Sequence, residues 1–365
     1  MNKLIKRILS TVLSVFFVSL VLIMYAPFTV RVGYQDDAYA HVMKDANMSG
    51  ESKVIDIAML GAHDAFSHHI NLRSKPDPGD DGIVQNKAIN TFFKGGIVRV
   101  SKAQNVGAKT LLNRGVRYFD VRISRVGDTW FTKHGLLDSE LKHYVGDIYE
   151  FLKDKPEEFI VFDIQHIYLG DSTISDFLNY LMGITLVKEG LNLNHFLNYT
   201  TNIPLEALEY FDVKGVDRGG IVILLNDDGS ATPDQKKIFY ERGNGENDTI
   251  SIRSKWHNQR TVTDIIPLID SEKEYLSTQI DKPYFRVNQA QLTPDYLKDP
   301  FGTLFNWSLI NLAAKSNKAL LNHPNFDEWL EEMPIFMVDY ANSKAGEFNT
   351  KINEKIIAHN QLLYA

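Results

Sequence analysis

The sequence contains no cysteine in 365 residues, which excludes disulfide bonds, thiolate metal ligands and a catalytic thiol. A chain of this length buries enough apolar surface to fold without disulfide bonds, even outside the cytoplasm. It also lacks internal repeats and low-complexity linkers, so the sequence predicts a single domain. Acidic residues exceed basic ones, 46 against 39, for a net charge of −7. This balance argues against a nucleic-acid partner and against membrane recruitment by bulk charge.

Charged residues are absent from an apolar run between Ile8 and Val30, which follows three basic residues in the first seven positions. Ala38-Tyr39-Ala40 then offers a cleavage site of small residues. Residues 1–40 are therefore typical of a secretory signal peptide. The apolar run is also long enough to span a bilayer, so an uncleaved anchor is the alternative. In either case we expect residues 41–365 to form a secreted, extracellular domain.

Strand-like and helix-like segments alternate through this domain. Apolar runs bounded by turn residues predict strands at Val54–Leu60, Val116–Ile123, Thr129–Gly135, Phe159–Ile164, Gly220–Leu225, Tyr284–Gln291 and Pro334–Tyr340. Helical periodicity predicts helices at Gln104–Arg114, Leu141–Lys153, Ser172–Leu186, Thr263–Thr278, Leu304–Leu321, Phe326–Glu332 and Glu347–Gln361. This alternation is typical of an α/β fold with a parallel sheet. At this length it favours a closed or distorted (β/α)8 TIM-type barrel.

Ionisable side chains stand at the ends of three of these strands. His63 and Asp64 follow the first apolar run, and Lys133-His134-Gly135 ends the third predicted strand. Asp120 and Arg122 are two residues apart, so both point to the same side of their strand. The carboxyl ends of the strands are where parallel barrels place their chemistry.

The ordered set of His63-Asp64, Phe119-Asp120-Val121-Arg122, Lys133-His134-Gly135 and Val338-Asp339-Tyr340 resembles the X-domain of phosphatidylinositol-specific phospholipases C. The resemblance is to the small members that consist of the X-domain alone, and it covers roughly residues 54–340. It implies cleavage of an inositol phospholipid on the glycerol side of the phosphate, with the inositol 2-hydroxyl as the attacking group. It also implies transient contact with a membrane surface, and we expect a monomer.

The resemblance assigns a role to each motif residue. His63 is the implied general base and His134 the implied general acid, roles that suit a side chain with a pKa near neutrality. Arg122 is the implied phosphate ligand, since a guanidinium pairs with phosphate oxygens. Asp64 is implied to work with Arg122 and His134; we do not expect it to orient His63, because adjacent side chains on a strand point apart. Asp339 is implied to orient His63, and closure of a barrel would bring the last strand beside the first.

Three further residues are candidates for the pocket that binds the substrate. Asp163 and His166 lie in a segment that resembles the fourth strand of the X-domain-only members, and Asp120 lies beside Arg122. Each has a structural alternative: Asp163 as a satisfied core acid, His166 as a surface histidine, and Asp120 as half of a buried ion pair with Arg122. The pair His68-His69 lies in a loop, where we expect it to be solvated.

We expect no metal or other cofactor, and in particular no calcium requirement. The calcium-dependent relatives place an asparagine beside the first histidine and several acids at the mouth, whereas here Asp64 follows His63 and Arg122 supplies positive charge. A metal-dependent glycerophosphodiesterase on the same barrel is one alternative, but that family has Arg-Gly after its first histidine and a Glu-x-Asp metal site, whereas here Asp64 follows His63 and Phe119 precedes Asp120. The other alternative is a barrel that binds a phospho-sugar or lipid without turnover, against which the complete set of ionisable residues argues.

Overall fold

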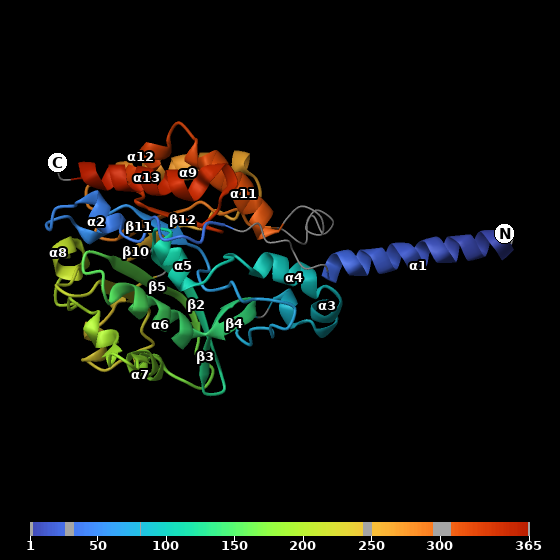
Figure 1. Cartoon of the computed structure of the whole chain (residues 1–365), viewed down its shortest axis with the longest axis horizontal. Helices are drawn as coiled ribbons and strands as arrows, with labels where there is room; N and C mark the ends of the chain where they lie inside the picture. Colours follow the sequence, from blue (N-terminus) through green and yellow to red (C-terminus); the bar gives the residue numbers. More distant parts are fainter. Residues whose placement is uncertain (1–2, 26–32, 81, 244–249, 295–307, 364–365) are drawn as a thin grey trace.

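Eight strands, each parallel to its neighbours, form the centre of the protein in the computed structural model, which describes residues 3–25, 33–80, 82–243, 250–294 and 308–363 (Figure 1). In space they run β10 (Ile252–Ser254), β11 (Phe285–Gln289), β12 (Ile335–Val338), β1 (Met59–Ala62), β2 (Val116–Val126), β5 (Phe159–Tyr168), β8 (Gly220–Leu225) and β9 (Tyr240–Glu241). The last strand, β12, pairs with β1, so the sheet curls back on its beginning. No pairing joins β9 to β10 within the described ranges. The fold class is thus confirmed in its distorted form, a barrel that is open between these two strands.

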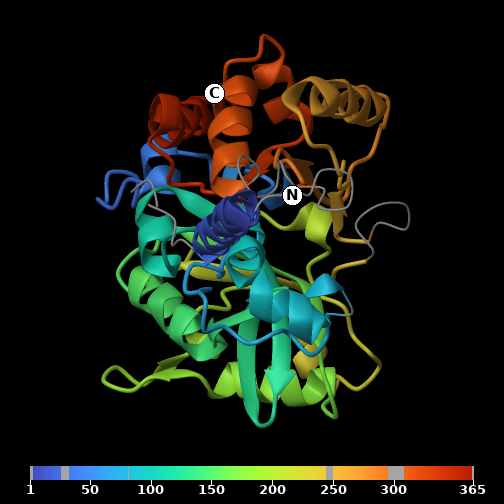
Figure 2. The same ribbon diagram turned by 90° about the vertical axis from the view of Figure 1, so that its right-hand side faces the viewer.

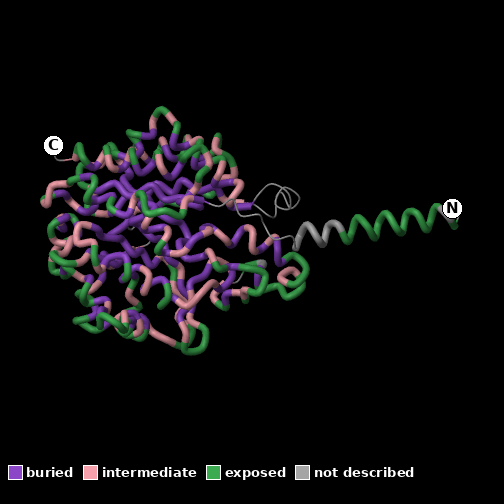
Figure 3. The backbone as a smooth tube through the Cα atoms, in the orientation of Figure 1, coloured by how far each residue is buried: buried purple, intermediate pink, exposed green. Residues whose placement is uncertain are grey.

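Alternate residues of the strands face two different apolar clusters, which explains why most of the barrel strands read as continuous apolar runs. The inner cluster takes one set of side chains from the strands, among them Met59, Tyr118, Val161, Val222, Val287 and Met337. The other set packs outward against the helices and includes Leu60, Phe119, Phe162, Ile223 and Phe336. Figure 3 shows this continuous buried zone through the centre of the body.

Helices cover the outside of the sheet (Figures 1 and 2). They are α2 (Val42–Ala46), α3 (Lys87–Phe92), α4 (Lys94–Ser101), α5 (Ala108–Asn113), α6 (Leu141–Leu152), α7 (Ile174–Gly183), α8 (Tyr210–Val213), α9 (Val262–Ser277), α11 (Leu309–Leu321), α12 (Phe326–Glu332) and α13 (Phe348–Leu362). The C-terminal helices α9, α11, α12 and α13 gather on one side of the barrel, and α6 and α7 lie on the other. The amphipathic helix α6 illustrates the packing, because its buried residues Tyr144, Ile148 and Leu152 repeat at helical spacing and face the outer cluster.

One predicted strand has a different place from the one we expected. Thr129–Gly135 forms β3 (Thr129–His134), but β3 runs antiparallel to both β2 and β4 (Leu136–Glu140) and lies outside the barrel path. The short strands β9 and β10 complete the barrel instead, and they are too short to be recognised as apolar runs. A small hairpin of β6 (Thr185–Leu186) and β7 (Leu191–Asn192) occupies the end of the helix predicted at Ser172–Leu186.

Two other boundaries also differ. The run predicted as a strand at Val54–Leu60 begins with a 3₁₀ turn, Val54–Asp56, so that the strand starts only at Met59. The described part of the helix predicted at Leu304–Leu321 begins at Leu309, and residues 304–307 lie outside the described residues.

The predicted leader divides into two parts. Helix α1 (Lys3–Tyr25) projects from the body (Figure 1), and its large apolar side chains from Ile5 to Val18 are exposed. Residues 26–32 lie outside the described residues, but residues 33–40 pack on the body: the Tyr34 N–H donates to the Asn342 carbonyl at 2.9 Å, and Ala40 belongs to the outer core cluster. The packed body therefore begins before the boundary that we expected at residue 40. Within the described ranges, no helix combines the length and the apolar character needed to cross a membrane.

Candidate active site

Polar side chains collect at the carboxyl ends of the strands, on the inner side of the barrel. The inner positions are apolar along the first part of the strands, as at Ile335 and Met337 of β12, and become polar at and beyond the strand ends. Asp339 is two residues after Met337, and Arg122 is two residues after Asp120, so the members of each pair point to the same side of their strand. The register sets Met337 of β12 beside Gly61 of β1, so Asp339 and His63, two positions further on, lie next to each other. The barrel closure predicted from the sequence thus brings these two residues together.

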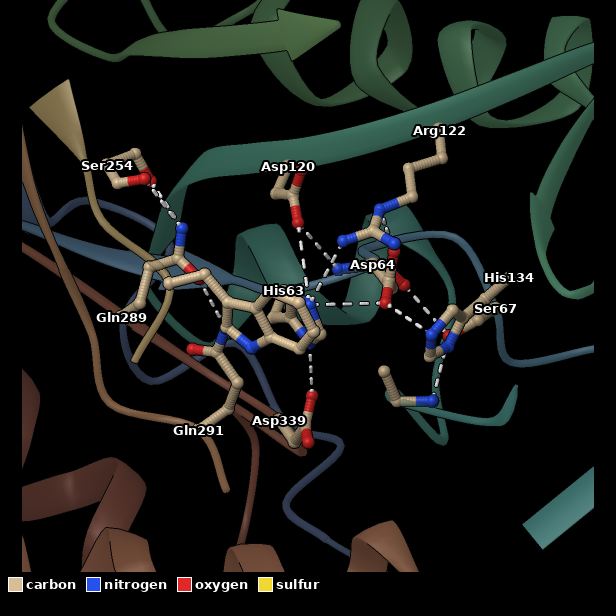
Figure 4. Close-up of polar contacts among 12 residues, drawn as sticks. His63, Asp64, Ser67, Asp120, Arg122, His134, Ser254, Gln289, Gln291 and Asp339 are labelled. Carbon is tan, nitrogen blue, oxygen red and sulfur yellow. Dashed lines mark hydrogen bonds and ion pairs between the residues drawn. The ribbon is translucent and has the colours of Figure 1, made fainter. Parts of the chain in front are cut away.

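His63 lies between carboxylates on both sides of its ring (Figure 4). Its Nδ1 lies 2.7 Å from Oδ1 of Asp339, and its Nε2 lies 3.2 Å from Oδ2 of Asp64 and 3.9 Å from Oδ2 of Asp120. Burial on its own would lower the pKa of His63, but the charges of Asp64, Asp339 and Asp120 outweigh it and raise the pKa to about 9. Burial also raises the pKa of Asp339, against the opposing effect of His63.

Asp64 binds three ionisable groups of the site, Arg122 and the two histidines. Its Oδ1 lies 2.7 Å from Nε of Arg122, and its Oδ2 lies 3.1 Å from Nε2 of His134 and 3.2 Å from Nε2 of His63. Burial would raise the pKa of Asp64, but Arg122 and the two histidines lower it, so the carboxylate is ionised. The expected pairing with Arg122 and His134 is present in this geometry.

Asp64 contacts His63, although we did not expect it to orient that ring. Strand β1 ends at Ala62, and Asp64 adopts a left-handed backbone conformation with φ 40°. The alternation of side chains along a strand therefore no longer applies, and the Asp64 carboxylate turns toward His63.

His134 reaches the site because the β3–β4 hairpin turns back at Gly135, which has φ 65°. Its Nδ1 lies 3.1 Å from the Ser101 carbonyl oxygen, which only accepts, so that nitrogen carries a hydrogen. Burial is the largest effect on the pKa of His134 and, with the positive charges of Arg122 and His63, lowers it to about 4, although Asp64 acts in the opposite direction. The imidazole rings of His63 and His134 are 6.0 Å apart at an angle of 75°.

Asp120 and Arg122 do not form the ion pair that we considered as an alternative. Among the described residues no ion pair joins them, and each instead contacts Asp64: Oδ2 of Asp120 accepts from the Asp64 backbone N–H at 3.2 Å. Burial raises the pKa of Asp120 to about 6, with Arg122 opposing. The hydrogen bond from Asp64 to Asp120 thus fixes the backbone of the turn at Asp64.

A cavity of about 580 Å³ opens above these groups. Of the residues that the sequence predicted, His63, Arg122, His134 and His166 line it. It is also lined by polar and aromatic residues that we did not predict, namely Lys133, Gln165, Trp256, Gln289 and Gln291. Gln289 and Gln291 lie at the carboxyl end of the strand predicted at Tyr284–Gln291, so the strand-end rule that identified His63 would have found them. The Ser101 carbonyl had no sequence signal, because any residue supplies a carbonyl.

Asp163 does not line this cavity. It is fully buried, and its carboxylate accepts from Nε of Arg242 at 2.6 Å and from the Tyr118 hydroxyl at 2.5 Å. The structural alternative for Asp163, a satisfied core acid, is therefore the one that the geometry supports. His166 reaches the cavity because an irregularity in the β2–β5 register, after Val121, sets it opposite Arg122.

Two groups of side chains in the described part of the chain have the spacing of metal ligands. One is His63, Asp64 and Asp120; the other is His68, His69 and Asp138. In the first group the Asp64 carboxylate already binds Arg122 and both histidines. The guanidinium therefore occupies the place that a cation would take beside this carboxylate.

Comparisons with known proteins support the fold and the family resemblance. No protein-family model matches the chain. It is 24% identical over 304 residues to the variant-surface-glycoprotein phospholipase C of Trypanosoma cruzi, covering 74% of this chain and 72% of that protein. It is 30% identical over 122 residues to the human PI-PLC X domain-containing protein 2, covering 32% of this chain and only 40% of that relative. A solved structure of the phosphatidylinositol-specific phospholipase C of Staphylococcus aureus has the same fold, with a TM-score of 0.58 at 16% identity over 89% of this chain and 98% of that one.

Proposed function

Since the chain belongs to the PI-PLC X-domain family, we propose that it cleaves the phosphodiester bond of an inositol phospholipid on the glycerol side of the phosphate. The observation that carries the proposal is the arrangement around Asp64. The rings of two histidines, with centroids 6.0 Å apart, flank a carboxylate that binds an arginine. Both histidines and the arginine line one cavity. A phosphodiester that enters this cavity meets a base, an acid and a positive charge together.

The attacking group is the 2-hydroxyl of the inositol ring, and His63 takes its proton at Nε2. Asp339 supports this step from the opposite side of the ring, since its carboxylate accepts from Nδ1 at 2.7 Å and stabilises the imidazolium that forms. The bond from the 2-hydroxyl oxygen to phosphorus forms while the bond from phosphorus to the glycerol oxygen breaks. A cyclic inositol phosphate and diacylglycerol result.

Arg122 stabilises the charge that develops on the phosphate oxygens. Its Nε is bound to Asp64, which holds the guanidinium in place at the wall of the cavity, with Nη2 3.5 Å from Nε2 of His63. His134 returns a proton from Nε2 to the departing glycerol oxygen. Its Nδ1 is anchored on the Ser101 carbonyl, so the ring stays oriented as the proton leaves.

The protons must be redistributed before this reaction begins. With a pKa of about 9 for His63 and about 4 for His134, the free site holds its proton on His63, whereas the proposed roles require it on His134. Oδ2 of Asp64 contacts Nε2 of both rings and offers a path for that transfer. The negative charge of a bound phosphodiester beside His134 would raise the pKa of that ring and favour the transfer.

The test is an assay of the purified full chain on phosphatidylinositol vesicles in the presence of a chelator. We expect turnover without added metal, and we expect Arg122→Ala to lower the rate by roughly 10²–10³, as for other lost electrostatic donors. Arg125→Ala is the matched control, because Arg125 lies on the same strand but pairs with Asp128 outside the cavity.

Three outcomes would contradict the proposal. Activity that chelation abolishes and calcium restores would indicate a metal-dependent enzyme. Turnover of glycerophosphodiesters alone would point to the related barrel enzymes. Saturable binding of inositol phosphate without any turnover would indicate a binding protein.

A further inference from the structure

A second group of ligand-type side chains lies outside the catalytic cavity. His68 and His69 come from the loop after β1, Asp138 from β4, and Tyr144 from α6. None of the four lines the cavity. We had expected the two histidines to be solvated, but only His69 is well exposed, at 58% of its side chain, while the Asp138 side chain is fully buried.

The four side chains converge on one point. The Tyr144 hydroxyl lies 3.0 Å from Nδ1 of His68 and 3.2 Å from Nδ1 of His69, and it donates to Oδ1 of Asp138. Nδ1 of His69 lies 3.6 Å from Oδ1 of Asp138. One ligand atom from each histidine and from the carboxylate lies within 4.8 Å of the others. Ligands about 2.0–2.2 Å from a tetrahedral zinc ion are separated by about 3.4 Å, so this spacing suits a zinc ion after small side-chain movements.

Charge and burial at the cluster also favour a cation. Asp138 carries a negative charge when ionised, and its side chain is fully buried. A buried carboxylate in this state is costly unless positive charge compensates it. The exposed ring of His69 leaves the cluster open to solvent on one side, which gives an ion a way in.

We propose that His68, His69 and Asp138 bind a divalent transition-metal ion, with Zn²⁺ as the fitting case. Two imidazole nitrogens and a carboxylate oxygen are ligands that zinc takes, and water would complete the tetrahedron. Tyr144 is not a ligand in this arrangement. Its hydroxyl contacts all three ligand atoms, so it must turn away from the two imidazole nitrogens when an ion binds, while its bond to Asp138 can hold that carboxylate as groups around zinc sites commonly do.

The position of this site suggests what the ion would do. His68 and His69 follow His63 on the loop after β1, and Asp138 follows His134 after the turn at Gly135. A zinc ion bound to both segments would tie together the two parts of the chain that carry the proposed base and acid. The site is therefore structural, and it is independent of the metal-free chemistry proposed for the cavity.

Zinc titration of the metal-stripped full chain, followed by calorimetry and by thermal unfolding, tests the site. We expect one saturable site, a higher unfolding midpoint with Zn²⁺, and cobalt spectra typical of four-coordination. His69→Ala and Asp138→Asn should each weaken binding at least tenfold, and Tyr144→Phe by roughly 10–100-fold. His143→Ala is the matched control, because His143 is exposed beside Tyr144 on α6 and outside the cluster, and it should bind zinc like the parent.

His63→Ala separates this site from the other group with metal-ligand spacing. We expect His63→Ala to bind zinc with the parent affinity. In the absence of zinc, we expect His69→Ala to unfold at the same midpoint as the parent, which would show that His69→Ala is folded. Absence of saturable binding would overturn the proposal. Binding that survives both His69→Ala and Asp138→Asn, or that is lost in His63→Ala, would place the ion elsewhere and would also overturn it.

Discussion

A single carboxylate, Asp64, contacts three of the side chains to which we assign the chemistry. It does so from a left-handed backbone conformation, φ 40°, which a non-glycine residue adopts only when the surroundings support it. Here the Asp64 N–H donates to Asp120, and Arg122 and both histidines surround the side chain. The strained turn thus places one negative charge where it holds the positive charge and orients both proton carriers.

The two histidines can be distinguished by the leaving group. The acid matters most when the leaving oxygen is a poor leaving group such as an alkoxide, so His134→Ala should lose roughly 10²–10⁴ in rate on phosphatidylinositol and much less on an activated aryl ester of inositol phosphate. His63→Ala should be equally impaired on both substrates, because the attacking hydroxyl is unchanged. Equal damage to His134→Ala on both substrates would refute its role as the acid.

The pH profile of His134→Ala on the aryl substrate tests the direction of proton transfer. Removing His134 leaves His63, whose folded pKa of about 9 lies above neutrality. A base works only when deprotonated, so the rate should rise with pH until it levels near that pKa. A rate that falls through the same range would mean that His63 acts as the acid. The parent enzyme cannot decide this, because both assignments give the same bell-shaped profile.

At the scale of elements, a residue with a large structural role comes directly after β9, the shortest strand of the barrel path. Arg242 follows β9, a strand of two residues, and is buried in the barrel, where it pairs with Asp163 of β5. The Tyr118 hydroxyl of β2 also donates a hydrogen bond to the Asp163 carboxylate. This buried ion pair lies beneath the catalytic layer and joins the open edge of the barrel to its centre.

Removal of Arg242 should therefore destabilise the fold. Arg242→Met leaves the Asp163 carboxylate buried without its cation, a change that typically costs about 3–5 kcal/mol of unfolding free energy. Combining it with Asp163→Asn removes both charges and should recover most of that loss. Urea unfolding of both variants checks this, with Lys237→Met as a surface control that breaks the exposed pair with Asp234. An unchanged midpoint for Arg242→Met would show that the pair does not stabilise the barrel.

At the scale of the whole molecule, residues 33–40 affect both the proposed export of the protein and the stability of its folded body. We propose that the protein is exported and acts as a monomer at a membrane surface, with Ala38-Tyr39-Ala40 as the cleavage site. Yet residues 33–40 pack on the body: Arg117 donates to the Ala40 carbonyl at 3.1 Å, and buried Arg114 pairs with Asp36. Cleavage after Ala40 would remove the Asp36 partner from Arg114, and it would separate the segment from the body.

This conflict can be measured. A chain that starts at His41 should be less stable than one that starts at Gly33 by about 1–3 kcal/mol of unfolding free energy, and should unfold at a lower temperature, because buried donors lose their partners. N-terminal sequencing of protein from the culture medium then shows which start is used. Equal stability of the two chains would mean that the segment contributes nothing, and an intact leader in the membrane fraction would indicate an anchor.

The sequence by itself determined the residues of the site whose signals are local. His63, Arg122, His134 and Asp339 were identified from motifs at strand ends, and the pairing of Asp339 with His63 followed from closure of the barrel. Most of the barrel strands were also predicted, because a strand buried on both faces is a continuous apolar run. These signals can be recognised in the sequence because each depends only on residues that are close together along the chain.

Only the tertiary structure decided the direction of β3, the contact between Asp64 and His63, and the partner of Asp163. The period of a strand predicts which side chains share a face, but it does not predict whether the strand runs parallel or antiparallel to its neighbours. A turn beyond the end of the strand also interrupts the alternation, as it does at Asp64. The partner of Asp163 is 79 positions away, just beyond a two-residue strand, and no local pattern links them. The same holds for the packing of residues 33–40 and for the approach of His68 and His69 to Asp138, which depend on contacts between distant segments.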